Sequence, residues 1–581
     1  MLRKIPGLLS FLLPAVLILS RCANPVTPQG GPKDVSPPKV VKATPPNHSI
    51  HFNSHDIELR FGEFIQLKEP QNKITVSPPY LSDIDYRLQG KTLLIKLRDS
   101  LRQNMTYSIY FGDAISDITE SNILKNFSYV FSTGSYIDSL SLEGDLVDAF
   151  TLQTEPDVWA TLYANENDTL PLDSLPMHVP PLYRTRSDDH GHFVLHNLKE
   201  GKFLLFAVKD LNGNTYFDQP TEAIAFCDSL VNPVYIPPSA EDTLKHDTVA
   251  RKDSLIRQDS LPALIPSFPV YKLRMFLQED SIQRILRKTL VSDRQVMLVF
   301  KYPLVNPQFE ALHFIPGESW MKPEFSKRMD TATLWLTSYP YDSLILKISD
   351  KGKAFDTASF DLTLKREKKK VSRSGTENQP HLVVTINPPD GRLNPFRSNP
   401  VLVSSMPLEK YDLTCAKLVA DKDTVPVPLV LADSIKRKMM VPYKWKEGKS
   451  YVLIVPDSAF TAINGRSNDS LRFSFKTYEA RDFGTILIRL KGTLRKGDLL
   501  LQLLGNNDAV VIQKTVTAPG DVLFDYLLPA TYRLRLIFDE NSNGRWDSGN
   551  FPRKLQPEEV QYFPKSIEVR GNWDIDETWE F

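Results

Sequence analysis

Residues 107–131 read YSIYFGDAISDITESNILKNFSYVF and show the pattern on which the fold prediction rests. Apolar and polar residues alternate through 107–111 and again through 127–131, which is the period of a half-buried β-strand. Short alternating runs of this kind, bounded by Pro, Asn, Asp and Gly, continue along the chain from residue 38. Helical periodicity is scarce, and residues 281–287 are its best short candidate. The sequence therefore predicts an all-β protein.

The same stretch recurs 344 residues later. The matching residues are Tyr107, Ile109, Asp113, Phe127, Tyr129 and Phe131 in the first copy and Tyr451, Leu453, Asp457, Leu471, Phe473 and Phe475 in the second. Near the start of each copy, Pro45-Pro46-Asn47 matches Pro388-Pro389-Asp390 at a shift of 343. Self-similarity at a fixed spacing marks a duplicated unit. Residues 38–134 and 381–478 are therefore predicted to be two copies of one β-sandwich, which we name modules A and A′.

A second pair of copies follows the first. At an ungapped shift of 329, the matching residues are Leu198, Phe203, Leu205, Asp210, Asn212, Asn214 and Asp218 in one copy and Leu527, Tyr532, Leu534, Asp539, Asn541, Asn543 and Asp547 in the other. We name residues 135–237 module B and residues 479–581 module B′. Strand-like runs within 265–367 predict a further β-sandwich, module C. The polar stretches 238–264 and 368–380 are expected to be solvated linkers.

Charge and composition exclude one class of partner and favour one kind of architecture. The 581 residues carry 70 Lys and Arg against 70 Asp and Glu, so the formal net charge is zero. Because no overall field would attract a polyanion, a nucleic-acid partner is not expected. Proline (44) outnumbers glycine (25), which reverses average usage. This balance favours β-domains joined by stiff connections, and hence an elongated multidomain chain.

The first 21 residues have the pattern of a signal peptide. Two basic residues precede an uncharged apolar run over 5–20, which is too short and too interrupted by Pro and Gly to span a bilayer. The run ends in Leu19-Ser20-Arg21-Cys22, which is similar to the lipobox of bacterial lipoproteins, although Arg21 stands where a small residue is usual. We expect Cys22 to carry lipid; an ordinary secretory signal or an uncleaved anchor are the alternatives. Residues 22–37 are rich in Pro and Gly and predict an extended tether.

A family resemblance supports this organisation. Residues 27–34 (TPQGGPKD), 44–47 (TPPN) and 131–134 (FSTG) resemble the bacterial Ig-like domain lipoproteins of Bacteroidetes, of the SbsA Ig-like (Big_5) type. The resemblance covers the tether and module A directly, and module A′ through the internal repeat. As a family, such domains are structural or adhesive spacers of envelope proteins without an active site. The resemblance therefore implies an envelope scaffold and names no ligand.

Modules B and B′ resemble a different family, the carboxypeptidase-regulatory or transthyretin-like β-sandwich. In B the pattern consists of Gly191, the strand 193–195, the turn Leu198-Lys199-Glu200-Gly201 and the strand 203–208. B′ departs from it, with Ala530 at the second glycine and Val522 at the Phe position. The resemblance implies tandem Ig-like and transthyretin-like β-sandwiches along one chain.

The strongest chemical pattern lies in module B′. Asp539, Asn541, Asn543 and Asp547 stand at positions 1, 3, 5 and 9 of a loop with Gly544 at position 6. This spacing opens a calcium loop of the EF-hand type, in which alternate oxygen-bearing side chains converge on one cation. Position 12 is Asn550 rather than a bidentate glutamate, so any Ca²⁺ affinity is expected to be weak.

Module B repeats this spacing, and a second explanation fits both loops. Its residues are Asp210, Asn212, Asn214 and Asp218, with its glycine at Gly213. A long β-hairpin whose Asp and Asn side chains cap their own backbone accounts for the same residues. The sequence leaves calcium binding and capping open.

The remaining candidates are weaker. Alternation places His192 and His196 on one strand face, where they are candidate ligands of a transition metal. Trp546 and Trp579 are the best candidates for exposed rings that stack on sugars. After Cys22 only two cysteines remain, 188 residues apart, so no disulfide framework is expected. No sequence-local motif of a phosphate loop, a nucleophile elbow or a zinc protease occurs. The chain is therefore not expected to be an enzyme. The alternative that stays open is a hydrolase whose paired carboxylates come together only in the folded chain, for example in module C.

Together these patterns predict a lipid-anchored, non-enzymatic scaffold of the bacterial outer membrane. Its expected partners are the membrane, through the lipid on Cys22, and other envelope proteins. The alternative is an adhesin or glycan-binding module that uses the loop tips of its β-sandwiches.

Overall fold

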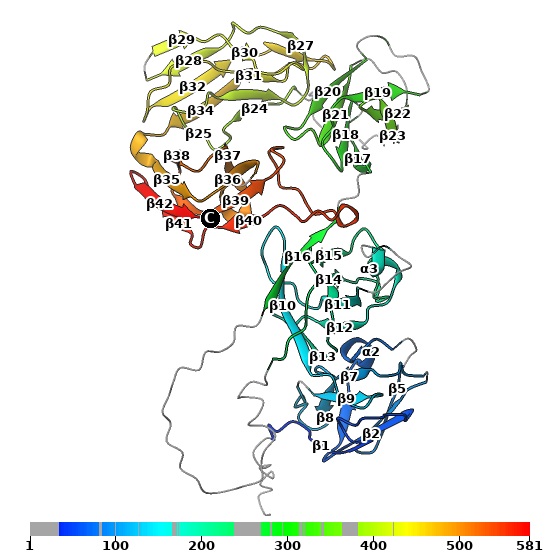
Figure 1. Ribbon diagram of the computed structural model, residues 1–581. Coiled ribbons are helices and arrows are strands. Elements are labelled where there is room, and N and C mark those ends of the chain that lie inside the picture. Colours follow the sequence, from blue (N-terminus) through cyan, green and yellow to red (C-terminus); the bar gives the residue numbers. More distant parts are fainter. Residues whose placement is uncertain are drawn as a thin grey trace, which may run out of the picture. The chain divides into compact units, whose positions relative to one another are not determined.

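The structure, a computed structural model, is built almost entirely from β-strands (Figure 1). It describes residues 34–80, 84–98, 100–125, 127–165, 171, 174–236, 269–278, 282–292, 294–312, 317, 320–337, 342–362, 381–421, 423–494 and 496–581. The helices in these ranges are short: α2 (Pro70–Lys73), α3 (Leu175–His178), η2 (Ala480–Asp482), η3 (Asn506–Asp508) and η4 (Phe551–Arg553). The all-β prediction is confirmed. Among the described residues, no helix has the length and apolar character needed to cross a bilayer.

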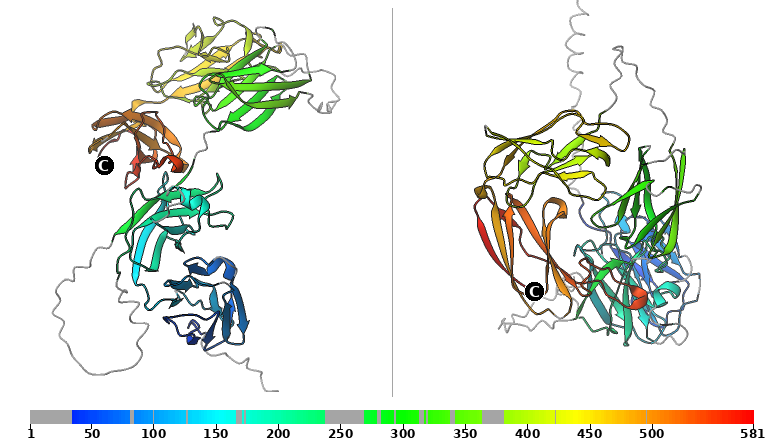
Figure 2. Two further views of the ribbon diagram at one scale, coloured as in Figure 1. Left: turned by 45° about the vertical axis from the view of Figure 1, so that its right-hand side comes forward. Right: turned by 90° about the horizontal axis from the view of Figure 1, so that it is seen from above.

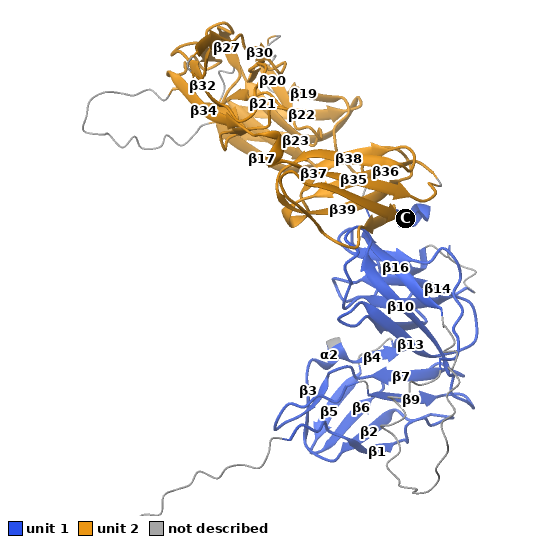
Figure 3. Ribbon diagram, turned by 90° about the vertical axis from the view of Figure 1, so that its left-hand side faces the viewer, with its two compact units in different colours: residues 1–278, 548–557 blue, residues 279–547, 558–581 orange. Residues whose placement is uncertain are grey.

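The chain divides into two compact units (Figure 3). Unit 1 contains modules A and B, over Met1–Gln278, together with the segment Ser548–Pro557. Unit 2 contains modules C, A′ and B′, over Glu279–Asp547 and Glu558–Phe581. Figure 2 shows the sheets of both units from two further sides.

Module A is a β-sandwich of small sheets. Its strands are β1 (Val40–Thr44), β2 (Asp56–Phe61), β3 (Ile65–Leu67), β4 (Thr75–Ser77), β5 (Asp85–Gln89), β6 (Thr92–Lys96), β7 (Thr106–Tyr110), β8 (Ile115–Asp117) and β9 (Ser128–Ser132). They form the sheets β1-β2-β6-β5, β4-β7-β9 and β3-β8. The alternation in 107–131 is realised in β7 and β9, which pair antiparallel with Tyr107 opposite Phe131. Both rings are buried in the core, whereas Tyr110 faces outward.

Module A′ repeats this architecture. Its strands are β24 (Val384–Asn387), β25 (Arg392–Leu393), β26 (Val401–Ser404), β27 (Leu408–Tyr411), β28 (Lys417–Ala420), β29 (Asp423–Pro426), β30 (Val430–Leu431), β31 (Lys438–Met440), β32 (Ser450–Val455), β33 (Phe460–Ala462) and β34 (Leu471–Thr477). The sheet β24-β26-β31-β30 corresponds to β1-β2-β6-β5, and β27-β33 corresponds to β3-β8. The third sheet, β25-β34-β32-β28-β29, adds an edge strand on each side of the three strands that match module A.

Module B folds as a single curved sheet. Its strands are β10 (Leu140–Asp148), β11 (Trp159–Ala164), β12 (Tyr183–Arg186), β13 (His192–Leu198), β14 (Phe203–Lys209), β15 (Ala223–Phe226) and β16 (Val270–Leu277). They are ordered β12-β11-β14-β15-β16-β10-β13. Strand β14 carries the long apolar run FLLFAV, and five of its seven residues are buried, so side chains on both of its faces are covered.

Module B′ contains the same strands in two sheets. They are β35 (Gly484–Lys491), β36 (Asp498–Leu504), β37 (Val510–Val516), β38 (Asp521–Leu527), β39 (Ala530–Asp539), β40 (Val560–Tyr562), β41 (Ile567–Val569) and β42 (Asp574–Glu580). One sheet is β38-β35-β42, and the other is β37-β36-β39-β40 with β41 also on β39. Strands β35 to β40 take the places of β10 to β15, so the structure extends the 329-residue match to whole strands.

The structure places β16 differently from the boundary expected at residue 265. β16 pairs in parallel with β10, from Glu143–Val270 to Asp148–Met275, and antiparallel with β15. In the same way, β42 pairs in parallel with β35 in module B′. The side chains of Leu273 and Met275 are buried in the core of modules A and B. Strand β16 therefore closes module B, whereas the expected linker 238–264 lies outside the described residues.

Module C is a two-sheet sandwich. Its strands are β17 (Ile285–Ser292), β18 (Gln295–Phe300), β19 (Pro307–Ala311), β20 (Met321–Phe325), β21 (Thr331–Leu336), β22 (Ser343–Asp350) and β23 (Lys353–Asp361). The sheets are β17-β18-β21-β20 and β19-β22-β23. The helix suggested for 281–287 was wrong, because Ile285 begins a strand that pairs with β18.

Within unit 1, modules A and B share one hydrophobic core. Met105 of A and Tyr183 and Phe203 of B belong to the same buried cluster. The Tyr183 hydroxyl donates to the Met105 sulfur at 3.5 Å, and the Arg184 amide donates to the Ser77 hydroxyl of A at 3.2 Å. The joint between A and B is therefore packed rather than linked by a free tether.

Within unit 2, polar and aromatic contacts join consecutive modules. At the joint of C and A′, Arg437 pairs with Glu324, and its guanidinium lies 4.7 Å from the Trp335 ring centroid. At the joint of A′ and B′, Phe396 stacks on Tyr526 with centroids 4.8 Å apart, and the Arg397 guanidinium donates to the Asp525 carbonyl at 2.7 Å. Each joint joins residues far apart in the sequence.

Candidate functional site

The polar loop of module B′ follows directly from the end of β39. Asp539 is fully buried and accepts the amides of Asn543 at 3.0 Å and Gly544 at 2.7 Å. The side-chain oxygen of Asn541 accepts the amide of Asn543 at 3.1 Å, which adds an Asx turn. The Asn541 and Asn543 amide groups both donate to one carboxylate oxygen of Asp547. The four predicted residues therefore lie together around one tight loop.

Module B builds the same loop after β14. Asp210 accepts the amides of Gly213 at 2.7 Å and Thr215 at 2.6 Å. The Asn212 and Asn214 side chains donate to the Asp218 carboxylate at 3.0 and 2.7 Å. The structure thus brings together all four predicted residues in this copy as well.

The placement of glycine in the two loops has a conformational reason. Positions 4 and 6 of both loops adopt positive φ angles: 77° at Gly213 and 68° at Thr215 in B, 57° at Ser542 and 80° at Gly544 in B′. Glycine tolerates this region best, and each copy places its glycine at a different one of the two positions. The loops share one backbone shape despite the different location of the glycine.

A buried glutamate completes each loop, and the sequence analysis missed it. Glu222 is fully buried and accepts the amides of Leu211 at 3.2 Å and Asp218 at 3.0 Å. Glu558 accepts the amides of Glu540 at 2.9 Å and Asp547 at 3.0 Å. Glu222 follows Asp218 by 4 residues, whereas Glu558 follows Asp547 by 11. The two glutamates match only when a gap is allowed between the copies, because the ungapped match at a shift of 329 ends at Asp547.

The environment of Glu558 makes its carboxyl group hard to ionise. Burial is the main cause, and the nearby Asp547 and Asp539 carboxylates add to it; together they raise its pKa to about 7. The two backbone amides that it accepts act in the opposite direction. Burial and the neighbouring carboxylates therefore outweigh the two amide donors in setting the pKa of Glu558.

The chemistry of these oxygens suits a hard cation. Carboxylate and amide oxygens are the ligands that Ca²⁺ prefers. However, within the described ranges no three His, Cys, Asp or Glu side chains gather in a geometry that would hold a metal. A Ca²⁺ ion at either loop would therefore need the Asn oxygens as ligands, and calcium binding remains a prediction. The backbone caps, by contrast, are present in both loops.

The predicted histidine pair does not converge on a common point. The Nδ1 atom of His192 lies 2.9 Å from the Asp145 carboxylate, and that of His196 lies 3.1 Å from the Ser141 hydroxyl. Both partners lie on β10, which pairs with β13. Each imidazole therefore binds its own neighbour across the strand pair.

The surface prediction for Trp579 was wrong. Its ring is 4% exposed and packs on Phe563 with centroids 5.3 Å apart, because β42 turns it into the core of B′. Trp546 lies in the loop of B′, where its indole N–H donates to the Glu558 carbonyl at 2.9 Å. Neither ring is arranged as an open platform for a sugar.

The cysteines fall into two groups. Cys22, the predicted lipid site, lies outside the described residues. Burial raises the pKa of the Cys227 thiol to about 11, and it also raises the pKa of Cys415, whose thiol donates to the Asp412 carbonyl at 3.0 Å. Both thiols are free, which matches small packed side chains rather than reactive thiolates.

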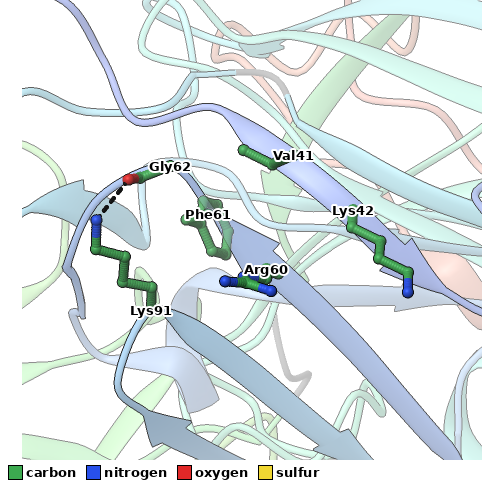
Figure 4. Close-up of a pocket in the computed structure, with 6 residues that line it drawn as sticks. All are labelled: Val41, Lys42, Arg60, Phe61, Gly62 and Lys91. Atoms are coloured by element: carbon green, nitrogen blue, oxygen red, sulfur yellow. Dashed lines mark hydrogen bonds between the residues drawn. The ribbon is translucent and has the colours of Figure 1, made fainter.

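A shallow cavity of about 400 Å³ lies on module A between β1, β2 and the turn before β6 (Figure 4). Its lining includes the basic side chains Lys42, Arg60 and Lys91. Lys91 donates to the Gly62 carbonyl at 2.7 Å, as the dashed line in Figure 4 shows, and lies 5.4 Å from the Phe64 ring centroid. One of the three cations is thus already engaged within the fold. No local sequence pattern marks this cavity, because its lining comes from separate strands.

Comparison with known proteins identifies one module. Residues 34–133 match the family model described as a bacterial Ig-like domain, and this range contains nearly all of module A. No curated protein matches the chain.

Solved structures of several multidomain proteins resemble parts of the chain. The major pilin subunit BcpA of Bacillus cereus is 11% identical over 76% of this chain and 99% of its own, with a TM-score of 0.14. The TIE protein of Bacillus anthracis is 9% identical over 95% of this chain and 76% of its own, with a TM-score of 0.14. The S-layer protein rSbsC is 10% identical over 86% of this chain and 65% of its own, with a TM-score of 0.12. These TM-scores are low, and none of these likenesses assigns a function to the chain.

Proposed function

We propose that this chain, whose residues 34–133 match a bacterial Ig-like domain, is a non-enzymatic structural protein of the bacterial cell envelope. It would act as a scaffold whose modules hold other envelope proteins at fixed positions. The proposal is supported by the family match of residues 34–133 and by the repetition of two module types. It places modules B and B′ in the carboxypeptidase-regulatory or transthyretin-like class.

The observation that carries the proposal is the packing of the joints within each unit. A and B share a buried core, and the joints on either side of A′ combine an ion pair with an aromatic contact. Such joints fix the spacing of neighbouring modules, which a scaffold requires. Flexible domains joined by tethers would serve capture of a ligand better than they would serve spacing.

The anchor forms the second part of the proposal. We infer that Cys22 is lipidated and attaches the chain to the outer membrane of a bacterium of the Bacteroidetes type. The support is the apolar run at 5–20 and the motif Leu19-Ser20-Arg21-Cys22. In palmitate labelling with membrane fractionation, the Cys22→Ser chain should lose the label and leave the membrane fraction. Label retained after Cys22→Ser would contradict the anchor but not the scaffold.

The scaffold itself is tested by its partners. The tagged full-length chain is to be purified from native membranes with mild detergent, and co-purifying proteins quantified by mass spectrometry. We expect at least one envelope protein to co-purify in stoichiometric amount. The Arg397→Glu chain, which is altered at the joint of A′ and B′, should retain less of this partner than the unaltered chain does. A chain recovered alone after chemical cross-linking in cells would argue against a scaffold.

The adhesin or glycan-binding alternative requires exposed aromatic rings gathered at one tip. Among the described residues, the exposed aromatic rings are spread over four modules: Phe64 and Tyr110 in A, Tyr136 and Tyr235 in B, Phe396 in A′ and Trp573 in B′. No module presents more than two of them, and this distribution favours the scaffold.

A second role for the polar loops is supported by the buried glutamates. We propose that Ca²⁺ binds weakly at Asp539, Asn541, Asn543 and Asp547 with Glu558 beside them, and less strongly in module B at Asp210, Asn212, Asn214 and Asp218 with Glu222. The ion would neutralise acidic groups and stabilise the loops. The melting temperature of the full chain should rise in millimolar CaCl₂ and fall back with EDTA, and Asp539→Asn should reduce the rise. A melting temperature that is the same in CaCl₂ and in EDTA would mean that the Asp and Asn side chains of these loops only cap the backbone.

A further inference from the structure

The two copies of the polar loop differ by one insertion. In module B, residues 219–221 connect Asp218 to Glu222, whereas in B′ residues 548–557 connect Asp547 to Glu558. Both connections are closed in the same way, because the amide of the aspartate donates to the glutamate at 3.0 Å in each copy. The seven extra residues are therefore not needed to build the polar loop. We call residues 548–557 the insertion loop.

The insertion loop is a closed structure that presents one aromatic ring. Asn550 and Leu555 exchange backbone hydrogen bonds at 2.8 and 3.0 Å. Between them, the Asn550 side chain caps η4 by accepting the amide of Arg553 at 3.1 Å. This arrangement fixes the position of Phe551, the first residue of η4. A loop that is ordered in advance loses little conformational entropy when it binds.

The insertion loop folds as part of unit 1, although the strands that flank it in sequence belong to unit 2 (Figure 3). Phe551 is 1% exposed, and its ring lies 5.7 Å from Phe206, 5.9 Å from Phe217 and 5.6 Å from Phe226 between centroids. Two of these contacts are edge-to-face at 88°, a favoured geometry for aromatic pairs. We call Phe206, Phe217, Phe226 and Phe276 of module B the aromatic face.

Polar contacts fix the insertion loop on both sides of this ring. The Ser548 hydroxyl donates to the Leu277 carbonyl at 2.6 Å, and the Gln556 side chain donates to the Phe226 carbonyl at 2.9 Å and the Asp228 carboxylate at 2.8 Å. At Gly549 the loop approaches Phe276 so closely that an added Cβ would lie 2.6 Å from its ring. The contact is thus specific in orientation as well as apolar.

The same sheet face in module B′ is not apolar. Phe206 pairs across the strands with Phe226 in B, and the corresponding pair in B′ is Arg535 with Tyr562. Arg535 donates to the Gln502 side chain at 2.8 Å and to the Tyr562 hydroxyl at 3.3 Å, so this face satisfies its own polar groups. One copy therefore carries an apolar face that needs a cover, and the other copy carries the loop that covers it.

We propose that the aromatic face of module B is a binding site for the insertion loop of the same chain, with Phe551 as the anchoring residue. This intrachain recognition goes beyond the joints between consecutive modules, because the loop lies within the sequence of module B′ whereas its binding site is formed by residues of module B. It explains why one copy has the insertion and why only the other copy has the phenylalanines.

Footprinting of the full-length chain tests the proposal. In one variant Phe551→Ala removes the anchor; in a second, residues 548–557 are replaced by Gln-Pro-Thr, the connection that module B uses between Asp218 and Glu222. Oxidation of Phe206, Phe226 and Phe276 by hydroxyl radicals should rise several-fold in both variants, whereas Phe524 in the core of B′ should stay protected. Leu555→Ala is the matched control, because this side chain is on the same loop but 53% exposed. Unchanged oxidation in both variants would overturn the proposal.

Binding in solution provides an independent measurement. A fluorescent peptide of residues 546–558 should bind the replaced-loop variant. The same peptide carrying Phe551→Ala should bind that variant at least ten-fold less tightly. The unaltered chain should bind neither peptide, because its own loop occupies the site. Sedimentation velocity then identifies the source of the loop. A monomer in every form supports binding within one chain. A dimer that depends on concentration and is lost with Phe551→Ala would show that a second copy supplies the loop, and it would refute the intrachain proposal.

Discussion

At the scale of single residues, Glu558 shows how a repeated loop can hold a costly charge. Its two carboxylate oxygens organise backbone amides on both sides of the loop, yet burial and two aspartates oppose its ionisation. If Glu558 only capped the loop, a glutamine, which offers a neutral acceptor oxygen, could replace it. The raised pKa shows that its ionisation also carries a cost in the folded state, so the capping role and the effect of the charge can be measured separately.

The pH dependence of stability follows from this pKa. The folded pKa of about 7 lies above the ordinary value of 4.5, so between these values the folded state retains a proton that the unfolded state has lost. Stability should therefore fall as the pH rises from 5 through 7, by about 2 kcal/mol. Urea unfolding of the full chain between pH 5 and pH 8, followed in B′ by hydrogen exchange, measures this loss. Glu558→Gln should flatten the profile and the exposed Glu540→Gln should not; equal profiles in all three proteins would contradict it.

Two tryptophans near the end of the chain allow a matched comparison. Trp579 is 4% exposed in the core of B′, whereas Trp573 is 48% exposed with Arg570 above its ring. We expect Trp579→Ala to destabilise B′ by about 3–5 kcal/mol, since it leaves a large cavity. Trp573→Ala should cost about 0.5 kcal/mol or less. Hydrogen exchange of β35 and β36 distinguishes the two, and similar losses for both would mean that β42 does not pack as described.

At the scale of elements, the sequence was sufficient wherever strand partners lie close in the chain. The alternation at 107–131 predicted β7 and β9, and the repeat predicted their counterparts in A′. It was insufficient for β16, whose parallel partner β10 lies 127 residues earlier, beyond the polar stretch 238–264. Pairing between strands so far apart in the sequence produces no local sequence pattern. Strand β16 was therefore assigned to the start of module C.

The same limit applies to the candidate site. The Asp and Asn residues at fixed spacing could be recognised because they act within one loop. Glu222 and Glu558 could not, because the insertion loop changes their distance from the aspartate in one copy. The aromatic face was also invisible, since Phe206, Phe217, Phe226 and Phe276 come from separate segments and each resembles an ordinary core residue.

The membership of β16 in module B can be tested on neighbouring residues of that strand. Leu273 is buried at 1% exposure, and Lys272 next to it is on the solvent side. Leu273→Asp should destabilise module B by about 3 kcal/mol or more, because it buries an unpaired carboxylate. Hydrogen exchange should then accelerate in β10 and β15, whereas Lys272→Asp should leave it unchanged. Faster exchange in β18 and β21 instead would assign the strand to module C.

At the scale of the whole molecule, the joints decide whether modules act singly or together. The Arg437–Glu324 pair is mostly buried, with side chains 17% and 19% exposed, and Trp335 both donates to Glu324 and lies beneath Arg437. Removal of Arg437 leaves the Glu324 carboxylate with only the Trp335 indole and the more distant, more exposed Lys438 ammonium, which costs more than the pair itself contributes. This joint is therefore sensitive to a single substitution.

Arg437→Ala should weaken the coupling between C and A′ by about 1–3 kcal/mol. In calorimetry the two modules should then melt in separate transitions, with faster hydrogen exchange in β20 and β21. Lys438→Ala is the control, because Lys438 lies 3.7 Å from Glu324 and is 45% exposed. A melting profile that is the same for all three chains would indicate that these modules are independent.

The parallel pairing of β10 with β16, and of β35 with β42, has a mechanical consequence. In each module the chain enters along the first strand and leaves along the last in the same direction. Tension that pulls the entering and leaving segments apart would therefore act along the two strands and load their hydrogen bonds in shear. Six residue pairs in B and seven in B′ would have to yield together rather than one after another. A pull applied to the two ends of either module would therefore meet all of these hydrogen bonds at once, so this pairing resists opening from the strand ends.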